Sequence, residues 1–86
     1  MIEIRIAERA IKYGYIYWTK KDDDKVTAEF DAVKEAEVLV NGISLGVKKI
    51  DYRYRRISIG VRIAGAFKSG SYFRISKKNS KLIVDV

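Results

Sequence analysis

Apolar and polar residues alternate with a period of two over much of the chain, a pattern typical of strands with one buried face. Ile2, Ile4 and Ile6 would share one face of a first strand, with Glu3 and Arg5 on the other. An aromatic strand is predicted over residues 13–18, Tyr-Gly-Tyr-Ile-Tyr-Trp. The pattern therefore predicts a mainly β protein.

Two hairpins are predicted from the turns between apolar runs. Asn41-Gly42 separates the runs 37–40 and 43–45, and both residue types tolerate the positive φ of a tight turn. A closing hairpin is predicted from residues 71–75 and 81–86, around the polar segment 77–80. Between the hairpins, residues 49–59 alternate as one long strand or as two strands with a bend, which places Arg53 and Arg55 on a common face.

Helix is predicted only in short segments. Asp22–Asp24 precede Val26, Phe30 and Val33 at helical spacing, and acidic residues favour the positive end of a helix dipole. We expect a short helix over 24–30, although the same stretch also alternates as a strand would. Residues 61–67 could form a second helical turn.

The predicted elements occur twice in the same order. A strand at 16–18 or 57–59 leads to a short helix ending at Phe30 or Phe67, and then to a hairpin. Many short strands with few helices favour a closed or partly closed barrel. We expect a small pseudo-symmetric β-barrel with one or two short helices.

Length and composition limit the possible functions. The chain has 86 residues, so we expect a single domain over 1–86. It contains no Cys and no His, which removes the usual nucleophile, general base and zinc ligands. The glycines match neither phosphate-loop fingerprint. We therefore expect no enzyme, no cofactor and no metal.

No targeting or membrane segment is predicted. The first six residues alternate Ile with charged residues and lack the apolar core of a signal peptide. No apolar run approaches the length of about 20 residues that a membrane span requires. We expect a cytoplasmic protein without a membrane partner, present as a monomer or a homodimer.

Basic residues are concentrated in the second half of the chain. The 18 Lys and Arg residues exceed the 11 Asp and Glu residues, for a net charge of +7. Residues 48–81 contain eleven of the basic residues and one acid, Asp51, whereas residues 1–47 contain seven basic and nine acidic residues. Such a positive region is typical of proteins that bind polyanions, although charge also serves solubility.

The second predicted unit resembles a known family. Residues 56–75, Arg-Ile-Ser-Ile through Tyr-Phe-Arg-Ile, followed by Lys81-Leu-Ile-Val84, are similar to the swapped-hairpin unit of AbrB-like transition-state regulators. Gly60, Ser71 and Ser80 depart from that family's pattern. A chain with two such units resembles the DNA-binding pseudobarrels of plant-type transcription factors and of some restriction-enzyme recognition domains. The resemblance implies a DNA-binding pseudobarrel fold.

The hexapeptide 51–56, Asp-Tyr-Arg-Tyr-Arg-Arg, is the strongest candidate site. Guanidinium groups bind phosphate or guanine edges, and tyrosine rings stack on unpaired bases. An edge strand protected by arginines is the alternative. If the pseudo-symmetry extends to the surface, Lys20-Lys21 and Arg62 would mark equivalent edges of one groove. The full predicted nucleic-acid surface contains Lys20, Lys21, Lys48, Lys49, Tyr52, Arg53, Tyr54, Arg55, Arg56 and Arg62.

Two further segments have competing interpretations. The rings of Tyr13, Tyr15, Tyr17 and Trp18 would form either a stacking platform or core, and a core explains only one face of that strand. The run Asp22–Asp24 is more typical of a solvated helix start than of a cation site.

These observations predict a nucleic-acid-binding protein, with duplex DNA as the favoured partner and transcriptional regulation as a possible role. The first alternative is a barrel that binds single-stranded nucleic acid or RNA through its aromatic side chains. The second alternative is an interaction module or small inhibitor whose basic face docks on an acidic protein.

Overall fold

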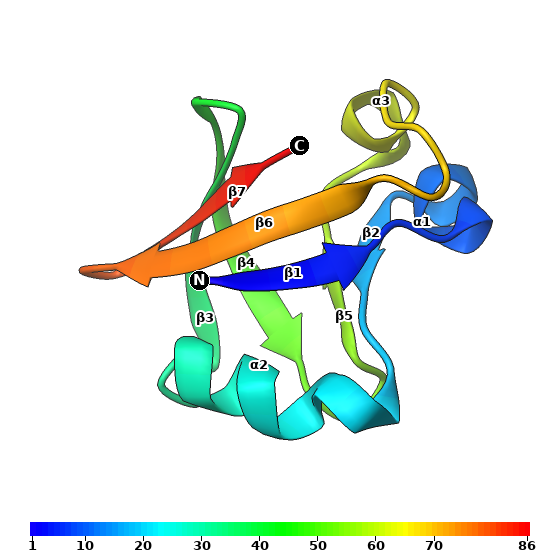
Figure 1. The fold of residues 1–86 in the computed structure, drawn as a ribbon. Coiled ribbons are helices and arrows are strands. Elements are labelled where there is room, and N and C mark those ends of the chain that lie inside the picture. Colours follow the sequence, from blue (N-terminus) through cyan, green and yellow to red (C-terminus); the bar gives the residue numbers. More distant parts are fainter.

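Seven strands form one curved sheet in the computed structural model, which describes residues 1–86 (Figure 1). The elements follow the order β1 (Ile2–Arg5), α1 (Glu8–Tyr13), β2 (Tyr15–Tyr17), the 3-10 helix η1 (Lys20–Asp22), α2 (Asp23–Glu29), β3 (Glu35–Val40), β4 (Ile43–Asp51), β5 (Arg56–Ser58), α3 (Val61–Ala64), β6 (Tyr72–Lys78) and β7 (Lys81–Asp85). The prediction of a mainly β, barrel-like protein with short helices is confirmed.

The sheet order is β1-β6-β7-β3-β4-β5-β2, so β1 and β2 form its two ends. All neighbouring strands are antiparallel except β3 and β7, which run parallel from the Glu37–Lys81 pair onward. The sheet curves so that its two end strands approach each other, and α1 connects them at one end of the gap between them (Figure 1). The barrel is therefore nearly closed, with its opening between β1 and β2.

Both predicted hairpins are present. Asn41 and Gly42 have φ angles of 49° and 84° in the two-residue turn between β3 and β4. Asn79 has a φ of 56° in the turn between β6 and β7. Asn and Gly tolerate this left-handed conformation better than other residues, which explains why these positions could be recognised in the sequence.

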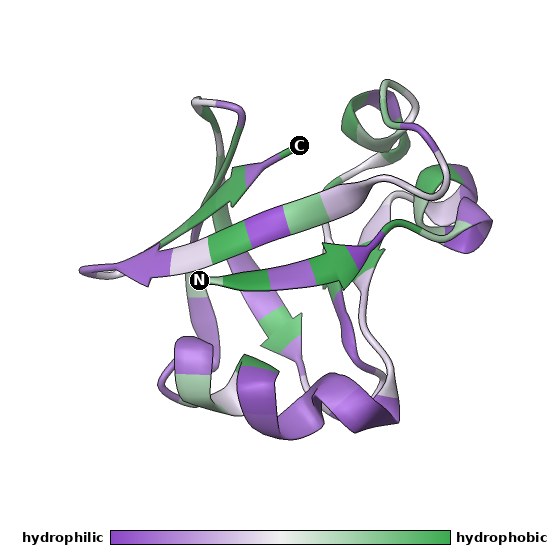
Figure 2. Ribbon diagram, viewed as in Figure 1, coloured by the Kyte–Doolittle hydropathy of each residue, from purple (hydrophilic) through white to green (hydrophobic).

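The barrel encloses a core made only of apolar side chains. Eighteen hydrophobic residues are buried, and no polar or charged side chain is buried with them. Figure 2 shows apolar and polar residues alternating along β1 and β6, as expected where one face of each strand packs inward. The Trp18 and Phe30 rings pack edge to face with their centroids 6.4 Å apart, which brings the residue after β2 against the residue after α2 in the core.

The predicted helices at 24–30 and 61–67 are confirmed as α2 and α3, although α3 is only four residues long. The helix α1 was not predicted. It ends at Tyr13 and is terminated by Gly14, which has the left-handed φ of 74°. The prediction of a strand from residue 13 is therefore wrong, because β2 begins only at Tyr15.

The predicted repeat is present in the order of the elements. One helical segment and a hairpin follow β2, and the same arrangement follows β5. Ile16 and Ile57 lie opposite each other where β2 and β5 pair. The two hairpins have different neighbours, however, because β4 pairs with β5 whereas β7 pairs with β3. The repeat therefore does not extend to the whole strand pairing.

The backbone at Gly14 lies against the backbone at Gly60, at the junction between β2, α1 and α3. The Gly14 carbonyl accepts hydrogen bonds from the N–H groups of Ile59 and Gly60, at 2.8 and 2.9 Å. A Cβ atom at Gly14 would lie 2.5 Å from the Gly60 carbonyl carbon and 2.5 Å from the Val61 nitrogen. Only glycine permits this approach together with a positive φ.

We predict that Gly14→Ala lowers the free energy of unfolding by more than about 2 kcal/mol, because it combines a left-handed alanine with a backbone clash. Gly42→Ala is the matched control, since Gly42 also has a positive φ but has no atom within 4 Å of the added carbon. It should cost only about 1 kcal/mol. Urea denaturation followed by circular dichroism measures both, and equal losses would contradict the role of the close approach.

Candidate nucleic-acid interface

The outer face of β2 carries two tyrosines. Tyr15 and Tyr17 are partly exposed on this face, whereas Ile16 and Trp18 alternate with them and are buried in the core. The aromatic segment thus has side chains in the core and also exposes rings on the surface, as its two interpretations required. Its inward side packs the barrel, and its outward side presents two phenol rings.

These rings belong to a continuous series of neighbouring arginine and tyrosine side chains on the outside of α1, β2, β5 and the β4–β5 turn. The guanidinium carbon of Arg9 lies 4.2 Å from the Tyr17 ring centroid, and the Tyr17 and Tyr15 centroids are 5.4 Å apart. Arg56 lies 4.8 Å from the Tyr15 centroid and 5.3 Å from that of Tyr54. We call this series the Arg–Tyr ladder; it contains Arg9, Tyr17, Tyr15, Arg56, Tyr54 and Arg53.

The end of the ladder lies on a turn and not on a strand. Residues 52–55 form the turn between β4 and β5, so the prediction that Arg53 and Arg55 share one face of a strand is wrong. The Asp51 carboxylate accepts a hydrogen bond of 2.9 Å from the Tyr54 N–H, and Arg55 has a φ of 56°. The turn exposes Arg53 and Tyr54 and directs the side chain of Arg55 elsewhere.

Arg55 is bound by a carboxylate of α2. Its Nε lies 2.9 and 3.0 Å from the two carboxylate oxygens of Asp23. The same carboxylate accepts a hydrogen bond of 3.0 Å from the Trp18 indole. The hydrogen bond from Arg55 holds the pKa of Asp23 below its usual value; burial opposes the shift and the Trp18 indole supports it. Arg55 therefore positions the turn, and its charge is already compensated.

Tyr52 also has a structural role and does not offer an exposed ring. Its hydroxyl donates a hydrogen bond of 2.6 Å to the Val33 carbonyl, and its ring packs against Trp18 with centroids 6.2 Å apart. Burial raises the pKa of the Tyr52 hydroxyl. Of the two tyrosines predicted in this segment, only Tyr54 presents an exposed ring, with a side chain that is 60% exposed.

The two lysines at the end of β4 point to different faces. Lys49 and Asp51 are two residues apart and share the outer face, on which Asp51 lies 4.0 Å from Arg56. Lys49 therefore extends the basic surface toward β4. Lys48 is opposite Ala36, a buried residue, and belongs to the other face.

The remaining predicted cations do not form one groove. Lys20 and Lys21 are exposed on η1, next to α2, whereas Arg62 is exposed on α3, which packs against α1. Figure 1 shows α3 and the η1–α2 segment at opposite ends of the barrel, with β2 and β5 running between them. The prediction that Lys20-Lys21 and Arg62 line equivalent edges of one surface is therefore wrong.

Arg9 was missing from the predicted surface because α1 was not recognised. Its signals are present in the sequence: Glu8 in the first turn, Lys12 in the last turn and Gly14 at the left-handed end. Without that helix, nothing places Arg9 beside Tyr17. The sequence predicts that Tyr15 and Tyr17 are aromatic candidates, but it does not indicate that arginines lie over their rings.

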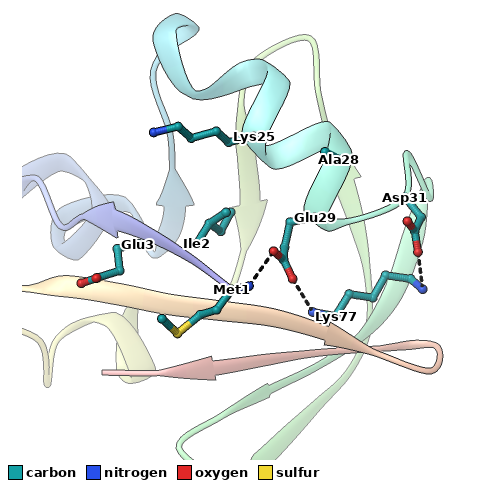
Figure 3. Close-up of a pocket in the computed structure, with 8 residues that line it drawn as sticks. All are labelled: Met1, Ile2, Glu3, Lys25, Ala28, Glu29, Asp31 and Lys77. Atoms are coloured by element: carbon teal, nitrogen blue, oxygen red, sulfur yellow. Dashed lines mark hydrogen bonds and ion pairs between the residues drawn. The ribbon is translucent and has the colours of Figure 1, made fainter.

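A hollow of about 770 Å³ lies between β1, α2 and β6, and ion pairs link the residues that line it (Figure 3). The Met1 amino group lies 2.8 Å from Glu29, and Lys77 Nζ lies 3.1 Å from Asp31. Hydrogen bonding from the amino group lowers the pKa of Glu29. Charges here compensate each other, so this hollow presents no excess charge to a ligand.

No group of three or more metal-binding side chains is placed to hold an ion, and no helix has the length and apolar composition to cross a membrane. Comparison with protein-family models, curated proteins and solved structures finds no match. Function must therefore be inferred from the chemistry of the surface.

We predict that Asp23→Asn lowers the melting temperature at neutral pH. The difference in melting temperature between the native protein and the variant should narrow in acid. The pKa of Asp23 is lowered on folding, so its carboxylate stabilises the fold above the unfolded pKa of about 3.9. That contribution disappears as pH falls through the lower folded value. Melting temperatures of both proteins between neutral pH and about pH 2 measure the effect.

Asp24→Asn provides the matched control, because Asp24 is exposed on the same helix and forms no ion pair. Its melting temperature should follow that of the native protein across the pH range. A gap between native protein and Asp23→Asn that stays constant down to the lowest pH would contradict the assigned role.

Proposed function

We propose that this protein binds nucleic acid through the Arg–Tyr ladder, with single-stranded nucleic acid as the preferred form. The proposal depends on one observation: three guanidinium groups and three phenol rings follow one another at 4.2–5.5 Å across the outside of α1, β2, β5 and the β4–β5 turn. The proposed role is binding without catalysis.

Stacking leaves the guanidinium groups available to a phosphate. An arginine that lies over a tyrosine ring uses its face for the contact, while the N–H groups at its edge stay free to donate hydrogen bonds. Arg9 and Arg53 form no ion pair, and the single carboxylate near Arg56 is at the long distance of 4.0 Å. The ladder therefore presents oriented, largely uncompensated cations.

The ladder contributes little to folding stability. A cation–π contact at an exposed site contributes about 0.5–1 kcal/mol. The core of eighteen apolar residues and the Asp23 hydrogen bonds already fix β2, β5 and the turn. Three flexible arginines that gather over tyrosine rings on one surface are better explained by a ligand than by packing.

The rings favour a single strand over a duplex. Bases of a single strand can stack on exposed aromatic side chains, whereas the bases of a duplex are already stacked on each other. Tyr54, at the end of the ladder, is the ring with the greatest exposure in the series. A strand whose phosphates follow the arginines would bring bases to this ring.

Duplex DNA is the second candidate. Arg53 and Lys49 are exposed cations on the same side as Arg56, and they would contact phosphates of a duplex as readily as those of a single strand. The repeated element order is compatible with the resemblance to DNA-binding pseudobarrels. The experiment that tests the proposal therefore compares single-stranded with duplex nucleic acid.

We predict that Arg53→Gln combined with Arg56→Gln weakens binding and flattens its salt dependence. Loss of two phosphate contacts should reduce the slope of log affinity against log salt by about 1.4 for a single strand or about 1.8 for a duplex. Fluorescence anisotropy of labelled single-stranded DNA, RNA and duplex DNA at several salt concentrations measures this slope. The folding stability of the variant should fall by no more than about 1 kcal/mol per arginine.

The matched control is Lys78→Gln combined with Lys81→Gln, which removes the same charge from the β6–β7 hairpin, away from the ladder (Figure 1). This variant should retain the native slope within about 0.5. Equal flattening in both variants would mean that only net charge matters and would contradict the ladder as the binding surface. Complete lack of binding to every polynucleotide at low salt would overturn the proposed function.

A further inference from the structure

We propose that the cleft between β1 and β2 accepts one unpaired base of the strand bound on the Arg–Tyr ladder. This inference rests on the proposed function and deepens it. The cleft has a volume of about 390 Å³ and lies at the opening of the barrel, where the sheet ends on both sides. Tyr17 belongs to both the ladder and the cleft, so one continuous surface joins them.

The cleft is bordered by two strand edges without partners. The Ile6 N–H bonds to the Ser71 carbonyl at 2.8 Å, so alternate residues of β1 face β6 and the backbone groups of Glu3 and Arg5 face the other way. The Trp18 N–H bonds to the Arg55 carbonyl at 3.1 Å, which by the same alternation turns the backbone groups of Tyr17 toward the opening.

These free edges suit the edge of a base. Unpaired N–H and C=O groups of a strand need a hydrogen-bonding partner, and a base edge carries both donors and acceptors. Asp22 and Glu3 also line the cleft, and their carboxylates could accept hydrogen bonds from an exocyclic amino group. Glu3 is 3.7 Å from Arg74, which compensates its charge.

The walls of the cleft suit the face of a base. Tyr17 and Tyr72 contribute accessible ring surface to the lining, whereas Ile4 and Trp18 are almost fully buried and the Trp18 indole N–H is already bonded to Asp23. Tyr72 is 48% exposed at the mouth, next to Arg5 across the β1–β6 pair. A planar base can stack on a tyrosine ring while its edge reaches backbone groups.

Charges at the cleft match a nucleotide more closely than they match an apolar ligand. Arg5 on β1 and Lys21 on η1 are both exposed, form no ion pair and stand on opposite sides of the opening. A base inside the cleft would leave its flanking phosphates at these cations. The strand could thus pass from the ladder across the mouth of the cleft.

An extended peptide fits this opening less well. β1 and β2 are four and three residues long and run in steeply crossing directions (Figure 1), so one added strand could pair with only a few residues of one edge. The confined volume of the cleft also suits a single planar group better than a strand of several residues. The base is therefore the occupant that we propose.

The test measures how strongly affinity depends on bases. Native protein is titrated with single-stranded DNA of about ten nucleotides and with a strand of equal length in which abasic sugars replace all nucleosides. The ratio of the two affinities reports base contacts, because both strands carry the same phosphates. Tyr72→Ala should reduce this ratio about tenfold, the effect expected for one stacked base, and should leave the salt slope unchanged.

Tyr13→Ala is the matched control, because Tyr13 is equally an exposed tyrosine, at 54%, but belongs to neither the cleft nor the ladder. It should retain the native ratio. Amide NMR of the native protein gives a second readout that needs no variant: the Arg5 and Tyr17 resonances should shift with both strands, because both carry phosphates, but should shift further with the intact strand than with the abasic strand.

Three results would overturn the inference. The first is an unchanged ratio in Tyr72→Ala, and the second is an absence of base-dependent shifts at Arg5 and Tyr17; in both cases a normal salt slope would leave the proposed function intact. The third is a peptide that shifts these resonances when the intact strand does not. Absence of any strand binding would instead remove the proposed function together with the inference.

Discussion

The Asp23 carboxylate joins the core, the first turn of α2 and the surface of the barrel. It accepts hydrogen bonds from the Trp18 indole on one side and from the Arg55 guanidinium on the other. Trp18 packs against Phe30 and Tyr52, so the inward end of this connection is fixed by aromatic contacts. The outward end fixes the turn that presents Arg53 and Tyr54. A charge-assisted hydrogen bond of this kind is stronger than a neutral one, which suits it to hold an exposed turn in one conformation.

Charges that are separated along the chain are partly brought together in space. Arg55, Arg74, Lys77 and Lys81 all come from the basic second half, and each one pairs with an acid of the first half: Asp23, Glu3, Asp31 and Glu37 respectively. The asymmetry seen in the sequence therefore overstates the positive potential of any one face. What remains is smaller and more specific: arginines ordered by tyrosines on the outside of β2 and β5.

Local rules were sufficient for the elements that carry local signals. The alternation of Ile2, Ile4 and Ile6 and the Asn41-Gly42 turn depend on neighbours in the chain, and both were predicted correctly from the sequence. The segment 51–56 could not be resolved in this way, because its alternation continues through a turn that is held in part by Asp23, a residue distant in the sequence that binds Arg55. The site residues divide in the same way, into those that local sequence identifies and those that only tertiary packing brings to the site. Arg53, Tyr54 and Arg56 were predicted from their composition, whereas the contact of Arg9 with Tyr17 depends on tertiary packing.

The parallel pairing of β3 with β7 has a consequence for the order of folding. β3 lies in the middle of the sheet, yet one of its two neighbours is the last strand along the chain. On a ribosome, the β3–β4 hairpin would emerge with one edge of β3 unpaired, and that edge would stay unpaired until Lys81–Asp85 have been synthesised. Such sequence-distant pairing slows folding and exposes intermediates to association with other chains. Nascent forms of this barrel should therefore depend on rapid closure by β7 to escape aggregation.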